Sequence, residues 1–156
     1  MTDHGTGTGI SVPPPLIFVG GFLIGLALEY VIPLAAPPAP VRIAVGLAGL
    51  AGFLYFDGRA MRGFGRAGTS VLPFGDRTTT IVTDGPYGVS RNPMYVGMTL
   101  LYVGVAVASG VIWALATLPV VLLVIRYYVI AREETYLLEK FGDSYRDYQS
   151  RVRRWI

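Results

Sequence analysis

The segment from Thr79 to Gly97 combines a tight turn, an arginine and a helix start directly before an apolar stretch. Residues 84–87 (Asp-Gly-Pro-Tyr) predict a turn, because glycine tolerates positive φ and proline fixes φ near the value that a turn needs. Asn92-Pro93 predicts a helix start, since Asn is a favoured N-cap and Pro at the first position lacks an N–H that would be unpaired anyway. The free N–H groups of such a helix end attract carboxylate or phosphate. The segment therefore predicts an anion-binding site at the edge of a hydrophobic helix.

A second charged group follows the last long apolar stretch. Arg132, Glu133 and Glu134 stand where a helix would leave a membrane, so the two carboxylates either hold a cationic ligand or are solvated and offset by Arg132 and Lys140. Taken singly, the turn, the helix start and the acids are each more typical of structure than of a binding site. Their occurrence in order, on one predicted face of a membrane, favours a binding site.

These two blocks resemble the cofactor motif of a known superfamily. Residues 82–87 (Val-Thr-Asp-Gly-Pro-Tyr) and 90–97 (Ser-Arg-Asn-Pro-Met-Tyr-Val-Gly) are similar to its first half in the isoprenylcysteine carboxyl methyltransferase and phospholipid methyltransferase superfamily. Residues 132–134 (Arg-Glu-Glu), Leu138 and 141–148 (Phe-Gly-Asp-Ser-Tyr-Arg-Asp-Tyr) resemble the second half. The resemblance covers about the C-terminal half of the chain, and two blocks in the right order are more specific than either alone.

The resemblance implies an integral membrane enzyme that takes a methyl group from S-adenosylmethionine (SAM) and releases S-adenosylhomocysteine. Its cofactor contacts, carried over position by position, fall on Thr79, Thr80, Ile81, Val82, Tyr87, Asn92, Pro93, Met94, Tyr95 and Glu133. Eukaryotic members have His where this chain has Asn92, and an amide cannot accept a proton near neutrality as imidazole can. Asn92 is therefore assigned a binding role and no role as a base.

SAM carries a carboxylate, an ammonium and a sulfonium, and the side chains of the two blocks suit these charges. Arg91 and the helix start beside it offer donors to the carboxylate. Glu133 or Glu134 can take the ammonium, while Tyr87 and Tyr95 offer ring faces to the sulfonium or walls to the adenine. Arg91, Glu133 and Glu134 are thus expected to position the reactants, and the sequence shows no dedicated general base.

The sequence does not specify the acceptor of the methyl group. The basic residue that eukaryotic carboxyl methyltransferases place four positions before the cofactor Glu falls on Val129 here, and Arg126 and Arg132 are the nearby substitutes on the substrate side. Glu29 interrupts the first apolar stretch. It is either an intramembrane acid near a substrate path or an acid close enough to the helix end to reach water or to pair with an Arg.

Composition indicates a membrane protein. Of 156 residues, 53% are hydrophobic and 15% are charged, against about 25% charged in ordinary soluble domains. The chain has no Cys and a single His, His4, which excludes thiolate nucleophiles, His-based triads and Cys or His metal clusters. The net charge of +3 is not a nucleic-acid signature, because the basic residues are spread over the loops.

Four apolar stretches predict an all-α polytopic fold with about four transmembrane helices. A bilayer requires about 20 apolar residues per helix, and the stretches cover residues 16–36, 41–56, 93–109 and 111 to about 126. The last one is expected to continue as a helix to Leu138. Small residues predict close helix packing through Gly21 and Gly25 in the first stretch and through Ala44, Ala48 and Gly52 in the second.

The remaining segments are expected to be a flexible tail at 1–15, an interfacial helix or substrate gate at 57–74, and a short final helix. Gly142 is a plausible end for the preceding helix. Ser144 with Asp147 resembles a capping box at the start of the final one.

The distribution of basic residues predicts the orientation. Residues 57–93 hold five of the Lys and Arg residues, and the segment from Arg132 holds six. The positive-inside rule therefore places both segments, and both termini, on the cytoplasmic side. We expect the loop 75–97 and the C-terminal helices to form a cofactor pocket on that face.

We expect one membrane-embedded domain over 1–156, with the tail at 1–15, two spans and the interfacial segment in 16–74, and the cofactor-binding core in 75–156. Its predicted function is SAM-dependent methyl transfer to a lipophilic acceptor, such as an isoprenylcysteine-type carboxylate, a lipid amine or another small lipid. The expected surroundings are membrane lipids, without nucleic acid or metal, and the oligomeric state is open. The alternatives are an NADPH-dependent membrane reductase related to sterol reductases, and a non-catalytic membrane scaffold.

Overall fold

The computed structural model describes residues 9–69 and 78–156, and its regular elements there are all helical. In chain order they are α1 (Pro14–Val31), α2 (Ala39–Ala67), the short 3₁₀ helix η2 (Gly85–Gly88), α3 (Pro93–Ser109), α4 (Trp113–Val124), the π-helical turn η3 (Ile125–Ile130), α5 (Ala131–Phe141) and α6 (Asp143–Arg151). The first two residues of α1 are prolines that were predicted to belong to the tail. Proline is tolerated there because the first helical N–H groups have no partner in the helix.

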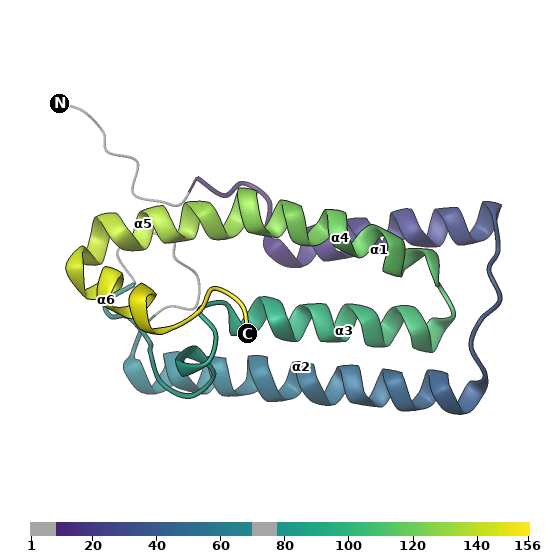
Figure 1. Ribbon diagram of the computed structural model, residues 1–156, viewed down its shortest axis with the longest axis horizontal. Coiled ribbons are helices and arrows are strands. Elements are labelled where there is room, and N and C mark those ends of the chain that lie inside the picture. The colour runs from purple at the N-terminus through teal and green to yellow at the C-terminus, as the bar shows by residue number, and fades with distance from the viewer. Residues whose placement is uncertain (1–8, 70–77) are drawn as a thin grey trace.

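The long helices run alternately up and down, with α1 beside α4 and α2 beside α3 (Figure 1). α4, η3 and α5 follow one another without a break and form one long helical rod. The α1–α2 and α3–α4 connections lie together at one end of the bundle (Figure 1). At the opposite end lie α5, α6, the C-terminal segment and the described part of the loop before α3. This end carries every residue of the two sequence blocks.

Among the described residues, three helices are long and apolar enough to cross a membrane: Pro14–Val31, Ala39–Ala67 and the rod Trp113–Phe141. The all-helical fold is therefore confirmed. α3 is apolar but has 17 residues, so a fourth crossing stays a prediction. The expectation of a separate interfacial helix after residue 56 is wrong for the described residues, because α2 continues unbroken to Ala67. Its interior has glycines but no proline to end it, and residues 70–74 lie outside the described part of the chain.

Glycines allow α2 and α3 to approach closely. A Cβ on Gly49 would lie 2.7 Å from the Cα of Gly104, so the two backbones touch directly. Gly52 packs against α3 as predicted, but Ala44 and Ala48 are exposed. Gly49 and Gly52 are three residues apart, so the face of α2 that contacts α3 follows a spacing of three residues rather than the predicted four. In the other helix pair the prediction is confirmed, since the small residues of α1 pack against Val121 and Ala114 of α4.

We expect Gly49→Ala to destabilise the protein by about 1–3 kcal/mol, because the added methyl meets backbone atoms that cannot move aside. Gly58→Ala on the same helix is the matched control, since its Cβ would meet nothing within 4 Å. That change should be stabilising by about 0.5–1 kcal/mol through helix propensity alone. Thermal unfolding of both variants in detergent tests the contact. Equal stability of the two variants would show that the close approach of α2 and α3 at Gly49 does not contribute to the stability of the protein.

The end of the rod differs from expectation in one detail. Gly142 ends α5 with φ +52°, a conformation that favours glycine, as predicted. α6 then begins directly at Asp143 with no side-chain cap. Ser144 therefore lies inside the first turn, where it cannot cap the helix, and the predicted capping box with Asp147 is not formed.

Candidate active site

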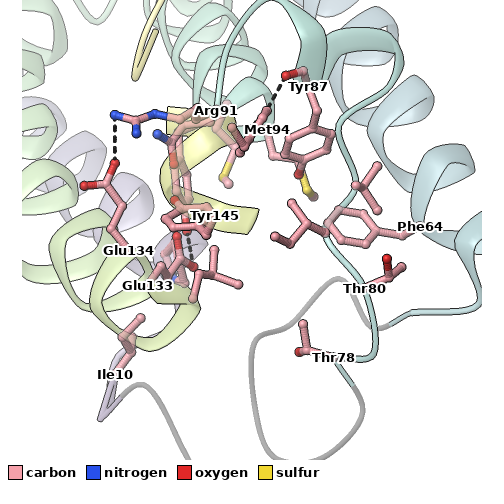
Figure 2. A pocket seen from close by; sticks show the side chains of 18 of the residues that line it. Ile10, Phe64, Thr78, Thr80, Tyr87, Arg91, Met94, Glu133, Glu134 and Tyr145 are labelled. Atoms are coloured by element: carbon pink, nitrogen blue, oxygen red, sulfur yellow. Dashed lines mark hydrogen bonds and ion pairs between the residues drawn. The ribbon is translucent and has the colours of Figure 1, made fainter. Parts of the chain in front are cut away.

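A cavity of about 210 Å³ opens at the end of the bundle that carries the two sequence blocks. Its wall is built from α2, the segment before α3, the first turns of α3, α5 and α6, and from residues at the start of the described chain. Figure 2 shows Phe64 and Thr80 on one side and Glu133 and Glu134 on the other, with Met94 between them and Arg91 extended toward Glu134. The lining is mostly apolar, and Arg91 is its single basic residue among those described.

Tyr87 is held in the cavity wall by the turn that the sequence predicts. Gly85 has φ +62°, and the Tyr87 N–H donates to the carbonyl of Asp84 at 3.2 Å. The Tyr148 hydroxyl donates to the Tyr87 carbonyl at 2.7 Å, and the Phe64 ring meets the Tyr87 ring edge-on at 5.4 Å. Burial raises the pKa of both phenols. Both therefore stay protonated near neutral pH, and the hydroxyl of Tyr148 keeps its proton for this hydrogen bond.

The C-terminal segment is bound to the residues just before α3. The Arg91 N–H donates to the carbonyl of Arg153 at 2.9 Å, and the side-chain amide of Asn92 donates to the carbonyl of Arg154 at 3.0 Å. α3 does begin at Pro93, as predicted, but Asn92 makes no side-chain cap, because its amide is turned toward Arg154. Asn92 lines the cavity and at the same time anchors the end of the chain.

Glu134 pairs with two arginines and joins three segments. Arg154 contacts both of its carboxylate oxygens, at 3.0 and 2.6 Å, and Arg91 pairs with it at 3.2 Å. The side chains of Arg91 and Glu134 are each only 11% exposed. Hydrogen bonding to Glu134 raises the pKa of Arg154 further above its usual range. The carboxylate of Glu134 is thus occupied by contacts that join α5, the segment before α3 and the C-terminal segment.

Glu133 points into the cavity and has no basic partner among the described residues. Its carboxylate accepts one hydrogen bond, from the hydroxyl of Tyr95 at 2.8 Å. This bond places a phenol and a carboxylate side by side in a mainly apolar wall. Of the two acids that the sequence left as alternatives, Glu133 is the one that can still accept a cation.

The remaining predicted cofactor residues divide into two groups. Thr80, Ile81, Val82, Met94 and Tyr95 line the cavity together with Tyr87 and Asn92. Thr79 and Pro93 do not line it. The Thr79 N–H donates to the hydroxyl of Thr69 at 2.9 Å, which ties the segment to the end of α2, and Pro93 is fully buried in the first turn of α3.

Two polar residues near the cavity were missed by the sequence reasoning. Thr78 is 5% exposed, lines the cavity and has a hydroxyl without a partner in the described structure. It immediately precedes the segment that the resemblance assigned to the cofactor, so extending that segment by one residue would have found it. Asp57 is buried against Gly97, where any Cβ would overlap its carboxylate. It does not line the cavity, and in the sequence it stands out only as the first acidic residue after the apolar stretch 41–56.

The three residues predicted for the substrate side do not line the cavity. Glu29 lies near the other end of α1, about 21 Å along the helix from Pro15. There it accepts hydrogen bonds from the N–H groups of Leu34 and Trp113, at 2.6 and 3.1 Å. Arg126 stacks on the ring of its neighbour Tyr127, 5.4 Å from its centre.

Arg132, the third of them, binds the start of the described chain. Its guanidinium lies 4.2 Å from the centre of the Tyr128 ring and donates to the carbonyl of Gly9 at 3.2 Å. It therefore joins α5 to the start of the described chain rather than to the cavity interior.

Residues 41–144 match the sequence model of the phospholipid methyltransferase family, and the chain belongs to that family. With three helices in the described part of the chain able to cross a membrane, it is an integral membrane protein of a methyltransferase family.

Two relatives extend the comparison. The chain is similar to a Haemophilus influenzae protein described as uncharacterized, with 43% identity over 63 residues, which are 40% of this chain and all of that protein. It is also similar to the protein-S-isoprenylcysteine O-methyltransferase of Schizosaccharomyces pombe, with 36% identity over 72 residues. That match covers 46% of this chain and 30% of the yeast protein. No solved structure matches the chain significantly.

Proposed function

We propose that the protein transfers a methyl group from SAM to a lipophilic acceptor, and that the cavity holds the cofactor. The observation that carries the proposal is Glu133, a carboxylate in the cavity wall without a basic partner among the described residues. A buried carboxylate is costly unless a cation or several hydrogen bonds offset it. The ammonium group of SAM would offset it.

The other charges of the cofactor also find complementary groups. The start of α3 lies at the cavity, where Asn92 and Met94 line it, and the positive end of the helix dipole there suits a carboxylate. Arg91 adds a positive charge on the same side, shared with Glu134. The rings of Tyr87 and Tyr95 are placed to face a sulfonium or to pack against adenine.

When bound, SAM would supply a methyl group on a sulfonium. A nucleophile attacks that methyl group in line with its bond to sulfur, and S-adenosylhomocysteine is the leaving group. The protein's contribution is then to hold the acceptor in line and to exclude water. Such positioning lowers the activation barrier by up to about 7–11 kcal/mol. Phe64, Ile81 and Leu137 give the cavity an apolar wall suited to a lipophilic acceptor. We place this face on the cytoplasmic side, in accordance with the basic loops.

A reductase that uses NADPH is less well supported. Its cofactor carries several phosphate charges, which proteins commonly bind with arginines and lysines. Among the described residues, the cavity wall offers Arg91 alone, and Glu134 already pairs with it.

Methyl transfer itself can be tested in membranes that contain the protein, supplied with SAM carrying a tritiated methyl group. Label that moves into the lipid extract, and that is lost with Glu133→Gln but kept with Glu139→Gln, would support the proposal. Glu139 is exposed on the same helix and outside the cavity, which makes it the matched control. Equal labelling by both variants would show that Glu133 does not take part in methyl transfer.

A further inference from the structure

Residues 9–13, which we call the strap, run along the rod before α1 begins (Figure 1). The sequence predicted a flexible tail here. In the structure the Ser11 N–H donates to the hydroxyl of Tyr128 at 3.1 Å, and Arg132 donates to the carbonyl of Gly9 at 3.2 Å. The strap is therefore bound at two points to residues more than 110 positions away in the chain.

The two attachment residues also bind each other. The guanidinium of Arg132 lies over the Tyr128 ring at 4.2 Å, a distance at which a cation and a ring attract. Tyr128 and Arg132 are one helical turn apart and lie on the same side of the rod. We call this pair of residues the latch. Its hydrogen bonds to the strap are exposed. Exposed contacts of this kind are individually weak, so breaking them costs little free energy.

The strap places an apolar side chain in the cavity wall. Ile10 lies between the two attachment points, is partly buried, and lines the cavity together with Pro14 and Pro15. It lies on the same side of the cavity as Glu133 (Figure 2). If the strap lifts, the wall beside Glu133 loses Ile10 and the cavity opens toward the outside of the rod.

We propose that the strap is a lid that closes the cavity over its ligand, and that Tyr128 and Arg132 are positioning residues that hold it closed. Closing such a lid excludes water from a mainly apolar cavity and retains the ligand. The latch contacts join only the strap and the rod, so the lid does not depend on which ligand the cavity holds. It gives Arg132 a task outside the cavity, in place of a direct contact with substrate.

The absence of Cys from the chain makes the strap directly measurable. Ile10→Cys introduces a single thiol at the cavity wall, and its rate of reaction with a water-soluble maleimide reports how often the strap opens. Adding Tyr128→Phe removes the oxygen that accepts from Ser11. We expect labelling to become roughly 2- to 10-fold faster, the effect of losing one hydrogen bond. Tyr127→Phe is the control, because this neighbouring phenol is 67% exposed and does not line the cavity.

Equal labelling rates for the Tyr128→Phe and Tyr127→Phe proteins would overturn the latch. A second arm adds S-adenosylhomocysteine to the protein that carries Ile10→Cys alone. Slower labelling would support closure over a ligand, whereas an unchanged rate, with binding shown by calorimetry, would overturn it. If S-adenosylhomocysteine does not bind at all, the proposed cofactor fails, while the comparison of the two tyrosine variants still decides whether the latch holds the strap.

Discussion

Replacing Glu133 by glutamine is expected to weaken binding of S-adenosylhomocysteine by roughly 10- to 150-fold. The substitution removes the negative charge that faces the cavity but leaves an oxygen able to accept from Tyr95 at the same place. The loss corresponds to about 1.5–3 kcal/mol, the usual contribution of a hydrogen bond to a charged group. Isothermal titration calorimetry of the detergent-purified variant measures it.

Glu139→Gln controls for the general loss of a negative charge from α5, since that side chain is exposed and does not line the cavity. Its affinity should equal that of the unmodified protein. Affinity that falls equally in both variants would mean that the ammonium group is not bound by Glu133.

Replacing Glu134 by alanine is expected to destabilise the fold by about 3 kcal/mol. The change leaves the buried guanidinium of Arg91 without its counter-ion and releases Arg154 from both of its carboxylate contacts. Removing one partner of a buried ion pair costs about 3–5 kcal/mol. We expect the lower end of this range because the Arg154 side chain is 35% exposed, so water can solvate it once Glu134 is gone. For a chain of this size the melting temperature shifts by about 2–4 °C per kcal/mol, so a scan in detergent resolves the effect.

Asp147→Ala is the matched control for this ion pair. Asp147 pairs with Arg151 on α6, and the two side chains are 74% and 67% exposed, a setting in which an ion pair contributes at most about 1 kcal/mol. A Glu134→Ala protein that melts within the range of this control would contradict a structural role for Glu134. The carboxylate would then be free to act in ligand binding.

Much of this arrangement was predictable because its signals are local. The turn at Gly85 and the helix starting at Pro93 follow from backbone preferences of glycine and proline, and the long apolar stretches gave helices where expected. The resemblance placed seven predicted cofactor residues beside Glu133 in one cavity wall.

What sequence reasoning missed depends on contacts between distant segments. Nothing local distinguishes Glu133 from Glu134; the difference arises because Arg91 and Arg154 converge on one of them. The amide of Asn92 was expected to cap a helix, but the C-terminal segment provides a competing carbonyl. Glu29 was a candidate for the substrate path, but it accepts from Leu34 just beyond the end of α1 and from Trp113, and the second of these contacts joins residues 84 positions apart.

Calorimetric titration of the purified protein with S-adenosylhomocysteine, in parallel with NADPH, tests the central claim most directly. We predict micromolar binding of S-adenosylhomocysteine and none of NADPH, because the cavity wall presents a carboxylate without a basic partner and only one, already paired, arginine among the described residues. Binding of NADPH alone would assign the cavity to a reductase. Binding of neither by folded protein would contradict a cofactor site and favour a non-catalytic membrane protein.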